Sequence, residues 1–344
     1  MTAMHIALLS PYSIGTMRGN ITTVRRINRF LNKLHVKTVI LAADTMSVND
    51  MAQRLAPSPP TLIHSFHARY CGETSVLLAD RFKIPFVMTI TGSDLYDPTL
   101  RDHPVTLGSL EKAAAIVCFS SSVADELVRR FAALSGRVVV IAQGVEAIPD
   151  SGKIDFGIPK NDFIILLPAA LRKVKNIEFA ISAVKGLWEV NNRIRLVIAG
   201  GEIDRTYANE IHSKIASTPW SDWIGEVPHE HMGALYRRAD IVLNCSLYEG
   251  MPNSLMEAMA LGRPVLATDI PGNRTLVQHG VTGWLFNSES AFREIVEKLS
   301  KDNLLRMEVG RCARNKVEVD YSPFNEAQQY QKLYSKLICR ENIM

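Results

Sequence analysis

The chain has 344 residues, and at roughly 150 residues per domain this length predicts about two domains. Apolar residues make up 47% and charged residues 22% of the chain, which excludes a disordered or fibrous protein, and the formal net charge of +4 does not predict a nucleic-acid-binding protein. The five cysteines are widely spaced without a Cys-x-x-Cys pair, and no apolar run is long enough for a signal peptide or a membrane span. These features predict a cytoplasmic protein.

Short apolar runs alternate with segments of helical period from the beginning of the chain. The strands expected in the first part are His5–Leu9, Thr38–Leu41, Leu62–His64, Phe86–Thr89, Ile116–Phe119 and Val138–Ile141, with helices such as Thr22–Leu34 and Val123–Phe131 between them. This alternation predicts β-α-β units and a mainly parallel sheet. A stretch rich in Gly, Pro and Asp at 143–162 then predicts a linker.

The same alternation begins again after this stretch. The expected strands are Ile164–Leu167, Leu196–Ala199, Ile241–Asn244, Val265–Thr268 and Trp284–Phe286, with helices near Asn176–Val190, His231–Arg238 and Pro252–Leu261. We therefore expect an α/β protein of two doubly wound domains, residues 1–145 and 146–321. Ligands of such sheets bind beyond the carboxyl ends of the strands, so the cleft between the two domains is the expected site.

Several common chemistries have no motif in this sequence. No Gly-x-Gly pair occurs, so the dinucleotide fingerprint is missing, and no Gly-x-x-x-x-Gly-Lys phosphate loop is present. No Asp-x-Asp pair occurs to hold a divalent cation, and the pairs His64/His67 and His229/His231 lack a third ligand at suitable spacing. We expect no metal site, so protein groups must neutralise any bound diphosphate.

The most informative stretch runs from the strand ending at Asn244 through a loop into the helix that begins near Pro252. A helix beginning here leaves the amides of residues 253–255 without intrahelical partners, which makes an anion-binding helix N-terminus. Glu249 precedes this helix and Glu257 lies inside it. Carboxylates beside an anion site accept hydrogen bonds from neutral hydroxyls. A sugar and a ribose on either side of a diphosphate supply such hydroxyls. The alternative is that both are ordinary solvated carboxylates.

Two basic segments complete the predicted site. Arg172 and Lys175 follow the first strand of the second domain, where a guanidinium fork and an ammonium suit a diphosphate leaving group; the alternative is an exposed basic turn. In the first domain, the segment 15–22 contains Gly19 and Asn20, which allow close backbone approach at a helix start. Its helix has a basic side at Arg25, Arg29 and Lys33, which is either simply solvated or receives an anionic acceptor or a lipid surface.

The segment from Glu249 to Glu257, followed by Ala258–Ala267, resembles the retaining glycosyltransferases of family 4, whose members have the GT-B fold of two facing Rossmann-like domains. Further pieces fall in family order: Arg172 with Lys175, Ala199–Gly201, Gly225–Val227 and Ala239–Ile241. The resemblance implies that Glu249 binds the hydroxyls of the donor sugar, Glu257 binds the ribose, and Arg172 and Lys175 bind the diphosphate. The donor-binding positions that it implies are Gly19, Asn20, Val227, Gly250, Met251, Pro252, Asn253, Ser254, Leu255 and Glu257.

The chain departs from the common pattern of this family at two places. Thr91 stands where many members carry a histidine before Gly92, Ser93 and Asp94, and Asp269–Arg274 lacks the acid of the usual Gly-Gly-x-x-Glu segment. These segments resemble a narrower branch that includes selenosugar synthases, whose acceptor is an anion. With Thr91 in the place of the histidine, Asp94 is the nearest candidate to orient an acceptor, and capping a turn is the alternative.

The expected function is therefore transfer of a hexose or N-acetylhexosamine from a nucleotide diphosphate sugar, for example UDP-glucose or UDP-N-acetylglucosamine, with retention and without a metal or other cofactor. The catalytic candidates are Arg172, Lys175, Glu249 and Asp94. A sugar phosphorylase or a nucleotide-sugar epimerase or hydrolase of the same fold is the alternative enzyme, and a non-catalytic nucleotide-sugar-binding protein is the alternative of another class. The sequence names neither the acceptor nor the oligomeric state, and weak peripheral membrane contact is one option. The resemblance implies that a helix near 322–338 crosses back to the first domain, and an ordinary surface helix is the alternative.

Overall fold

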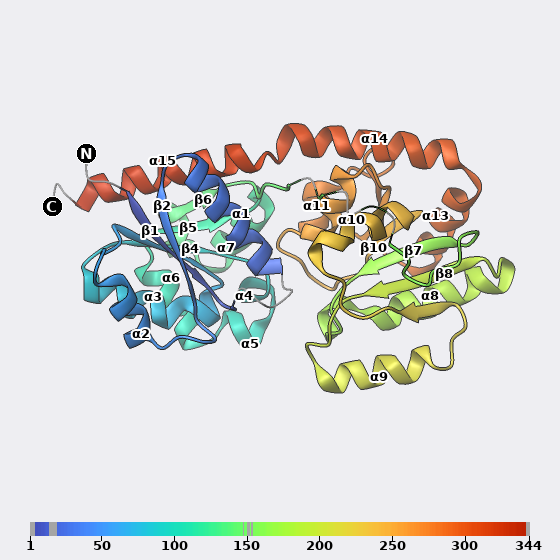
Figure 1. The fold of residues 1–344 in the computed structure, drawn as a ribbon, viewed down its shortest axis with the longest axis horizontal. Coiled ribbons are helices and arrows are strands. Elements are labelled where there is room, and N and C mark those ends of the chain that lie inside the picture. The colour runs from blue at the N-terminus through green and yellow to red at the C-terminus, as the bar shows by residue number, and fades with distance from the viewer. Residues whose placement is uncertain (1–3, 14–18, 147, 150–151, 153, 342–344) are drawn as a thin grey trace. The chain divides into compact units, whose positions relative to one another are not determined.

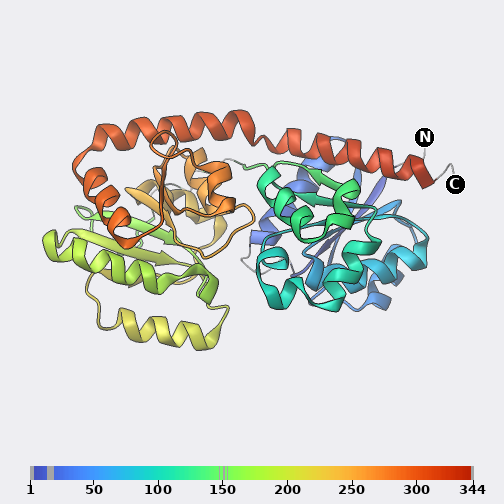
Figure 2. The same cartoon turned by 180° about the vertical axis from the view of Figure 1, so that it is seen from behind.

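The computed structural model describes residues 4–13, 19–146, 148–149, 152 and 154–341. The predicted segment 15–18 therefore lies outside the described residues. The chain divides into two compact units, which we call unit 1 (Met1–Gly144 with Tyr321–Met344) and unit 2 (Val145–Asp320). Figures 1 and 2 show the elements of each unit from two sides.

Unit 1 is built on a six-stranded parallel sheet with the strand order β2-β1-β3-β4-β5-β6. Its strands are β1 His5–Ser10, β2 Lys37–Ala42, β3 Leu62–Phe66, β4 Phe86–Thr89, β5 Ala115–Cys118 and β6 Val138–Val140. Its helices are α1 Gly19–Lys33, α2 Val48–Leu55, α3 Ala68–Phe82, α4 Ser93–Tyr96, α5 Pro98–Arg101, α6 Pro104–Lys112, α7 Ser121–Arg130, the 3₁₀ helix η1 Ala132–Arg137, and α15 Pro323–Glu341.

Helices cover both faces of this sheet, as Figures 1 and 2 show, and the alternation of side chains along β1 explains why. Ala7 and Leu9 pack into a core cluster with residues of α2, α3, α6 and α7, whereas Ile6 and Leu8 pack into a second cluster with α1 and α15. Successive residues of a strand point to opposite faces, so a continuous apolar run predicts a sheet that is buried on both sides.

The last helix, α15, is an integral part of unit 1. Its residues Tyr330 and Tyr334 are fully buried in the cluster shared with α1. The Tyr334 hydroxyl lies 2.6 Å from Nδ1 of His64, whose Nε2 lies 2.7 Å from the Thr89 hydroxyl. Burial lowers the pKa of His64 to about 3, so this imidazole is neutral. His64 is therefore a core histidine whose hydrogen bonds join α15 to the sheet.

Unit 2 has a second parallel sheet of six strands with the order β12-β11-β10-β7-β8-β9. Its strands are β7 Phe163–Pro168, β8 Ile194–Ala199, β9 Ser221–Trp223, β10 Ile241–Asn244, β11 Val265–Thr268 and β12 Trp284–Phe286. Its helices are the 3₁₀ helix η2 Lys173–Lys175, α8 Ile177–Val190, α9 Arg205–Ile215, α10 His229–Arg238, α11 Asn253–Ala260, α12 Pro271–Leu276, α13 Glu289–Lys301 and α14 Asn303–Asp320.

The strand order of unit 2 is that of the doubly wound nucleotide-binding sheet. The first strand of the unit, β7, lies between β8 on one side and β10 on the other, so the direction of winding reverses between β7 and β10. Ligands of open parallel sheets bind at such a switch point, beyond the carboxyl ends of the two central strands. The topology of unit 2 therefore directs attention to the segments that follow β7 and β10. None of the helices in the described part of the chain is long and apolar enough to cross a membrane.

Candidate functional site

The segments after β7 and β10 meet at the switch point of unit 2. The amide of Leu247, after β10, donates to the carbonyl of Val174, after β7, at 2.9 Å. This contact brings together the two segments that carry Lys175 and Glu249, and the Lys175 Nζ lies 2.5 Å from Glu249 Oε1. Two of the residues predicted from distant parts of the sequence thus form an ion pair at the position where this fold binds its ligands.

Glu249 is a mostly buried carboxylate that accepts hydrogen bonds from three donors. Its Oε1 accepts from Lys175 Nζ, from the Ser246 hydroxyl at 2.7 Å and from the Asn244 amide at 3.3 Å, and its side chain is 14% exposed. Burial alone would raise the pKa of the Glu249 carboxyl. The charge and hydrogen bond of Lys175, the Ser246 hydroxyl and the charge of Arg172 outweigh this effect, and the pKa lies below its usual value. Glu249 is therefore ionised at neutral pH and is an acceptor for hydroxyl groups.

Arg172 lies at the same place, directly before η2, in an extended conformation. Its Nε is buried and has no hydrogen-bond partner in the described part of the chain. Asn176, at the other end of η2, has a φ of 50°, a left-handed conformation that turns the chain from η2 into α8. Arg172 and Lys175 thus present two cationic groups beside the carboxyl end of β7.

Helix α11 begins directly after the Glu249 loop. Pro252 occupies its cap position and makes no side-chain cap hydrogen bond, and the predicted residues Asn253, Ser254 and Leu255 form the first turn. The helix ends as predicted, because Gly262 has a φ of 67°, its amide donates to Met259, and the amide of Arg263 donates to Ala258. The amide-rich end of α11 therefore lies at the carboxyl end of β10, where it favours an anion.

Glu257 has hydrogen-bond partners of its own, different from those of Glu249. It is 8% exposed and accepts hydrogen bonds from the Tyr236 hydroxyl at 2.9 Å and from His229 Nε2 at 3.0 Å, both from α10. Neither partner was predicted, because the sequence spacing of α10 and α11 gives no indication that the two helices pack together. A carboxylate that accepts two hydrogen bonds still has lone pairs for further donors. Glu257 can therefore also accept hydrogen bonds from the hydroxyls of a ribose.

The His229–Glu257 pair makes a testable prediction about stability and pH. Hydrogen bonding to Glu257, opposed by burial, raises the pKa of His229 above its ordinary value of about 6.5. A folded-state pKa that is raised contributes stability below the unfolded pKa and loses it as the pH rises through the folded pKa. We expect His229→Gln to lower the free energy of unfolding at pH ~5.5 and to have little effect at pH ~8.5, by less than about 1 kcal/mol because the imidazole is 42% exposed.

Urea unfolding of both proteins at the two pH values measures this difference, and His231→Gln on the same helix is the matched control. A loss of stability for His229→Gln that is equal at both pH values would contradict the proposed ionic contact.

The remaining donor-binding candidates are distributed over both units. Val227 is buried in the turn between β9 and α10, two residues after Gly225, whose φ is 79°. Gly250 and Met251 are buried in the loop before α11. Gly19 and Asn20 begin α1 in unit 1, after the carboxyl end of β1. Among these residues, the structure brings Gly250 and Met251 next to Glu249, and Gly19 and Asn20 belong to the other sheet.

Asp94 is a buried carboxylate that accepts hydrogen bonds from the backbone. It is 1% exposed, and its carboxylate accepts three backbone amides at 2.9 Å, those of Ala68, Thr91 and Gly92. Gly92 has a φ of 126°, so this carboxylate caps a turn that only glycine readily adopts. These bonds are the ones that the turn-capping alternative requires, and the acceptor-orienting role of Asp94 stays a prediction.

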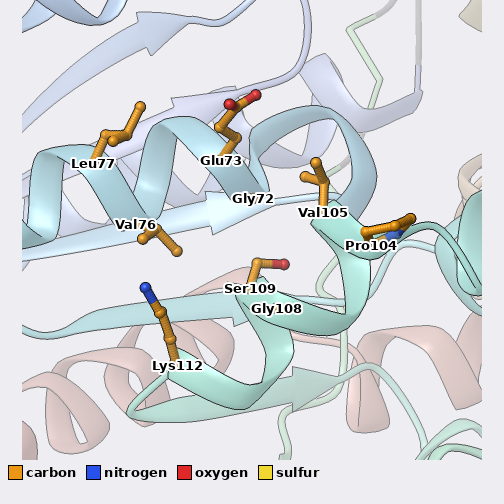
Figure 3. A pocket seen from close by; sticks show the side chains of 9 residues that line it. All are labelled: Gly72, Glu73, Val76, Leu77, Pro104, Val105, Gly108, Ser109 and Lys112. Atoms are coloured by element: carbon orange, nitrogen blue, oxygen red, sulfur yellow. The ribbon is translucent and has the colours of Figure 1, made fainter.

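Unit 1 also contains an apolar hollow of about 190 Å³ between α3 and α6. Figure 3 shows that Val76 and Leu77 of α3 and Val105 and Ser109 of α6 border it. None of the residues predicted for the site lines this hollow. The hollow is therefore separate from the polar groups at the switch point of unit 2.

Comparison with known proteins points to one family for unit 2. Residues 152–316 match the family model described as glycosyl transferases group 1. Glycosyltransferase 1 domain-containing protein 1 of Xenopus tropicalis is 27% identical over 94% of this chain and 96% of its own length. A D-inositol 3-phosphate glycosyltransferase of Corynebacterium aurimucosum is 26% identical over 80% of this chain and 71% of its own length.

Solved structures agree on the fold of the whole chain. HepE from Anabaena, crystallised in complex with UDP and glucose, has a TM-score of 0.78 at 17% identity and covers 97% of this chain and 100% of its own. Sucrose-phosphate synthase from Thermosynechococcus elongatus has a TM-score of 0.81 at 18% identity and covers 98% of this chain and 100% of its own. The predicted fold class, an α/β protein with the GT-B fold and two parallel sheets, is confirmed.

Proposed function

We propose that this chain, whose residues 152–316 match the glycosyl transferases group 1 model, is a retaining hexosyltransferase or N-acetylhexosaminyltransferase that uses a UDP-sugar donor without a metal ion. The observation that carries the proposal is the Lys175–Glu249 pair at the switch point of unit 2, beside Arg172 and the N-terminus of α11. The complex of HepE with UDP-glucose, at a TM-score of 0.78, supports UDP as the nucleotide.

In this proposal the cationic groups act on the departing diphosphate. The bond between the anomeric carbon and the diphosphate oxygen breaks, and its electron pair leaves with UDP. The acceptor forms the new bond on the same face of the sugar, and a hydroxyl acceptor gives its proton to the departing diphosphate. Arg172, Lys175 and the amide end of α11 stabilise the negative charge that develops on UDP. Fixed charges and dipoles of this kind make the largest contribution to many enzymatic rates. They also replace the divalent cation for which the sequence has no Asp-x-Asp motif.

The two carboxylates recognise hydroxyl groups on either side of the diphosphate. Glu249 is ionised and anchored through one oxygen, and we assign it to the hydroxyls of the donor sugar. Glu257 is held by Tyr236 and His229, and we assign it to the ribose. Val227, in the turn before α10, is assigned to the uracil base through its main chain. Unit 2 is therefore proposed as the donor domain.

Unit 1 is proposed as the acceptor domain, and the exposed charges of its first helix indicate the chemical class of the acceptor. Arg25, Arg29 and Lys33 are exposed along α1 at four-residue spacing, and α1 contains no acidic residue. This positive charge favours an anionic acceptor, in keeping with the resemblance to the branch that includes selenosugar synthases. Weak contact with an anionic membrane surface is a second use of the same side chains.

A thermal-shift screen of nucleotide sugars in the presence of a chelator tests the donor. We expect UDP-glucose or UDP-N-acetylglucosamine to raise Tm, because a ligand that binds only the folded state stabilises it by mass action. A shift with free sugars or inorganic phosphate and none with any nucleotide sugar would contradict the proposal and favour a phosphorylase. A shift with a donor that is never consumed would favour the non-catalytic alternative.

A further inference from the structure

Two buried asparagines are linked to Glu249 by hydrogen bonds, and neither belongs to the donor-binding residues described above. Asn244 ends β10 and is 4% exposed, and Asn273 lies in α12 and is fully buried. The Asn273 amide donates to Asn244 Oδ1 at 3.4 Å, and the Asn244 amide donates to Glu249 Oε1 at 3.3 Å. We propose that Asn273 and Asn244 are positioning residues that orient the Glu249 carboxylate for the donor sugar, an inference that rests on the proposed function.

The hydrogen bonds fix the direction in which the Asn244 amide points. Its oxygen accepts from the amide of Ser246 at 3.1 Å as well as from Asn273. Since both of these groups donate, the oxygen of Asn244 must face them, and its NH₂ group must face Glu249. Replacing Asn273 would remove one of the two donors that hold Asn244 in this orientation.

Asn273, in α12, is held by hydrogen bonds to Thr268, the last residue of β11. Its NH₂ group donates to the carbonyl of Thr268 at 2.9 Å and to the Thr268 hydroxyl at 3.2 Å. The Thr268 hydroxyl in turn donates to the carbonyl of Ser246 at 2.8 Å. The end of β11, α12 and the segment after β10 are thus joined by one buried network, and such networks lose orientation when one member is removed.

All three bonds to Glu249 converge on the same oxygen. Lys175, Ser246 and Asn244 donate to Oε1, and no described residue donates to Oε2. A carboxylate anchored through one oxygen in a 14% exposed position presents the other oxygen in a fixed direction. This is the arrangement needed to accept a hydroxyl of a sugar, and it depends on the donors that hold Oε1.

The backbone of α12 supports the same loop directly. A Cβ atom built on Gly272 would lie 2.3 Å from the carbonyl oxygen of Glu249 and 3.0 Å from that of Gly250. No side chain fits there without moving the loop, so only glycine permits α12 to pack so closely against Glu249. The segment that differs from the usual Gly-Gly-x-x-Glu pattern therefore supplies both the backbone support and the Asn273 amide.

The substitution Asn244→Asp separates orientation from packing, because it keeps the shape and exchanges the donor for a carboxylate beside Glu249 Oε1. Lys175 and Arg172 are the cationic groups that face this position. Two carboxylates so close share a proton at low pH and repel each other once both are ionised. We therefore expect the variant to recognise the sugar at low pH and to lose this recognition as the pH rises.

Calorimetric titration with UDP and with UDP-glucose, in chelator at pH ~5 and pH ~8, measures the ratio of the two affinities. The terminal phosphate of UDP ionises a second time at about pH 6 and UDP-glucose has no such ionisation, so each variant is compared with the wild type at the same pH. Relative to the wild type, we expect the Asn244→Asp ratio to be about tenfold lower at pH ~8 than at pH ~5, and the Asn273→Ala ratio to be lowered about tenfold at both. UDP itself is expected to bind all three proteins alike at each pH. Asn209→Asp, on the exposed face of α9, is the matched control for added charge.

Wild-type ratios in both variants, with Tm showing that they fold, would overturn the inference. An equal loss of UDP and UDP-glucose binding would also overturn it, because it would indicate general damage to unit 2. Failure of the wild-type protein to bind either ligand is a different result, since it contradicts the proposed function itself.

Discussion

Replacing Lys175 with Met is expected to lower kcat for transfer from the UDP-sugar by about 10² to 10³-fold, with a less than tenfold change in Kd for the donor. The reason is that the ammonium group assists mainly when negative charge develops on the departing diphosphate. The same substitution removes the cation 2.5 Å from Glu249 Oε1, so the pKa of Glu249 is expected to rise and the acid limb of the pH–rate profile to move upwards.

Steady-state kinetics and donor titration of the Lys175→Met variant measure both effects. Lys173→Met is the matched control, because Lys173 is exposed in the same 3₁₀ helix and is not among the described residues that bind Glu249. A weaker donor Kd with an unchanged kcat for Lys175→Met would show that the lysine contributes only uniform binding and would contradict the account.

Replacing Glu326 with Gln is expected to lower the stability of unit 1 by about 3–5 kcal/mol. Glu326 of α15 and Arg26 of α1 form an ion pair with two hydrogen bonds of 2.9 and 3.1 Å, and their side chains are 0% and 3% exposed. Removal of the carboxylate charge leaves a buried guanidinium without its counter-ion, which is far more costly than loss of an exposed pair. Thermal unfolding followed by a probe in unit 1 should show a Tm lower by about 10 °C.

The exposed pair Arg314–Glu318 on α14 supplies the control, and Glu318→Gln is expected to change stability by less than about 0.5 kcal/mol. Joint replacement of Arg26 and Glu326 by apolar residues of similar size should restore much of the loss, since no charge is then left buried. Similar Tm values for Glu326→Gln and Glu318→Gln would contradict the view that this pair fixes α15 to unit 1.

Most strands were predictable because a strand buried on both faces is a continuous apolar run. The predicted strands Phe86–Thr89, Ile241–Asn244, Val265–Thr268 and Trp284–Phe286 coincide with β4, β10, β11 and β12. The strand β9, Ser221–Trp223, was missed because it is three residues long, polar at two of them and at the edge of its sheet. Hydrophobic pattern cannot identify a strand that buries little apolar surface.

The candidate site was predictable only where residue type and position within an element were sufficient. The spacing of Glu249 and Glu257 around a helix start, and cations after β7, were visible in the sequence. The partners of these groups were not: His229 and Tyr236 reach Glu257 from another helix, and Asn273 reaches Glu249 only through Asn244. For Asp94 the sequence left acceptor orientation and turn capping open, and its three backbone hydrogen bonds depend on a turn whose geometry residue type alone does not give.

The most direct test of the account is the release of UDP from UDP-glucose or UDP-N-acetylglucosamine by the wild-type protein in the presence of a chelator. The account predicts slow hydrolysis of at least one of these donors that is unchanged by the chelator and lost in Glu249→Gln. No release of UDP, or release that requires a divalent cation, would contradict it.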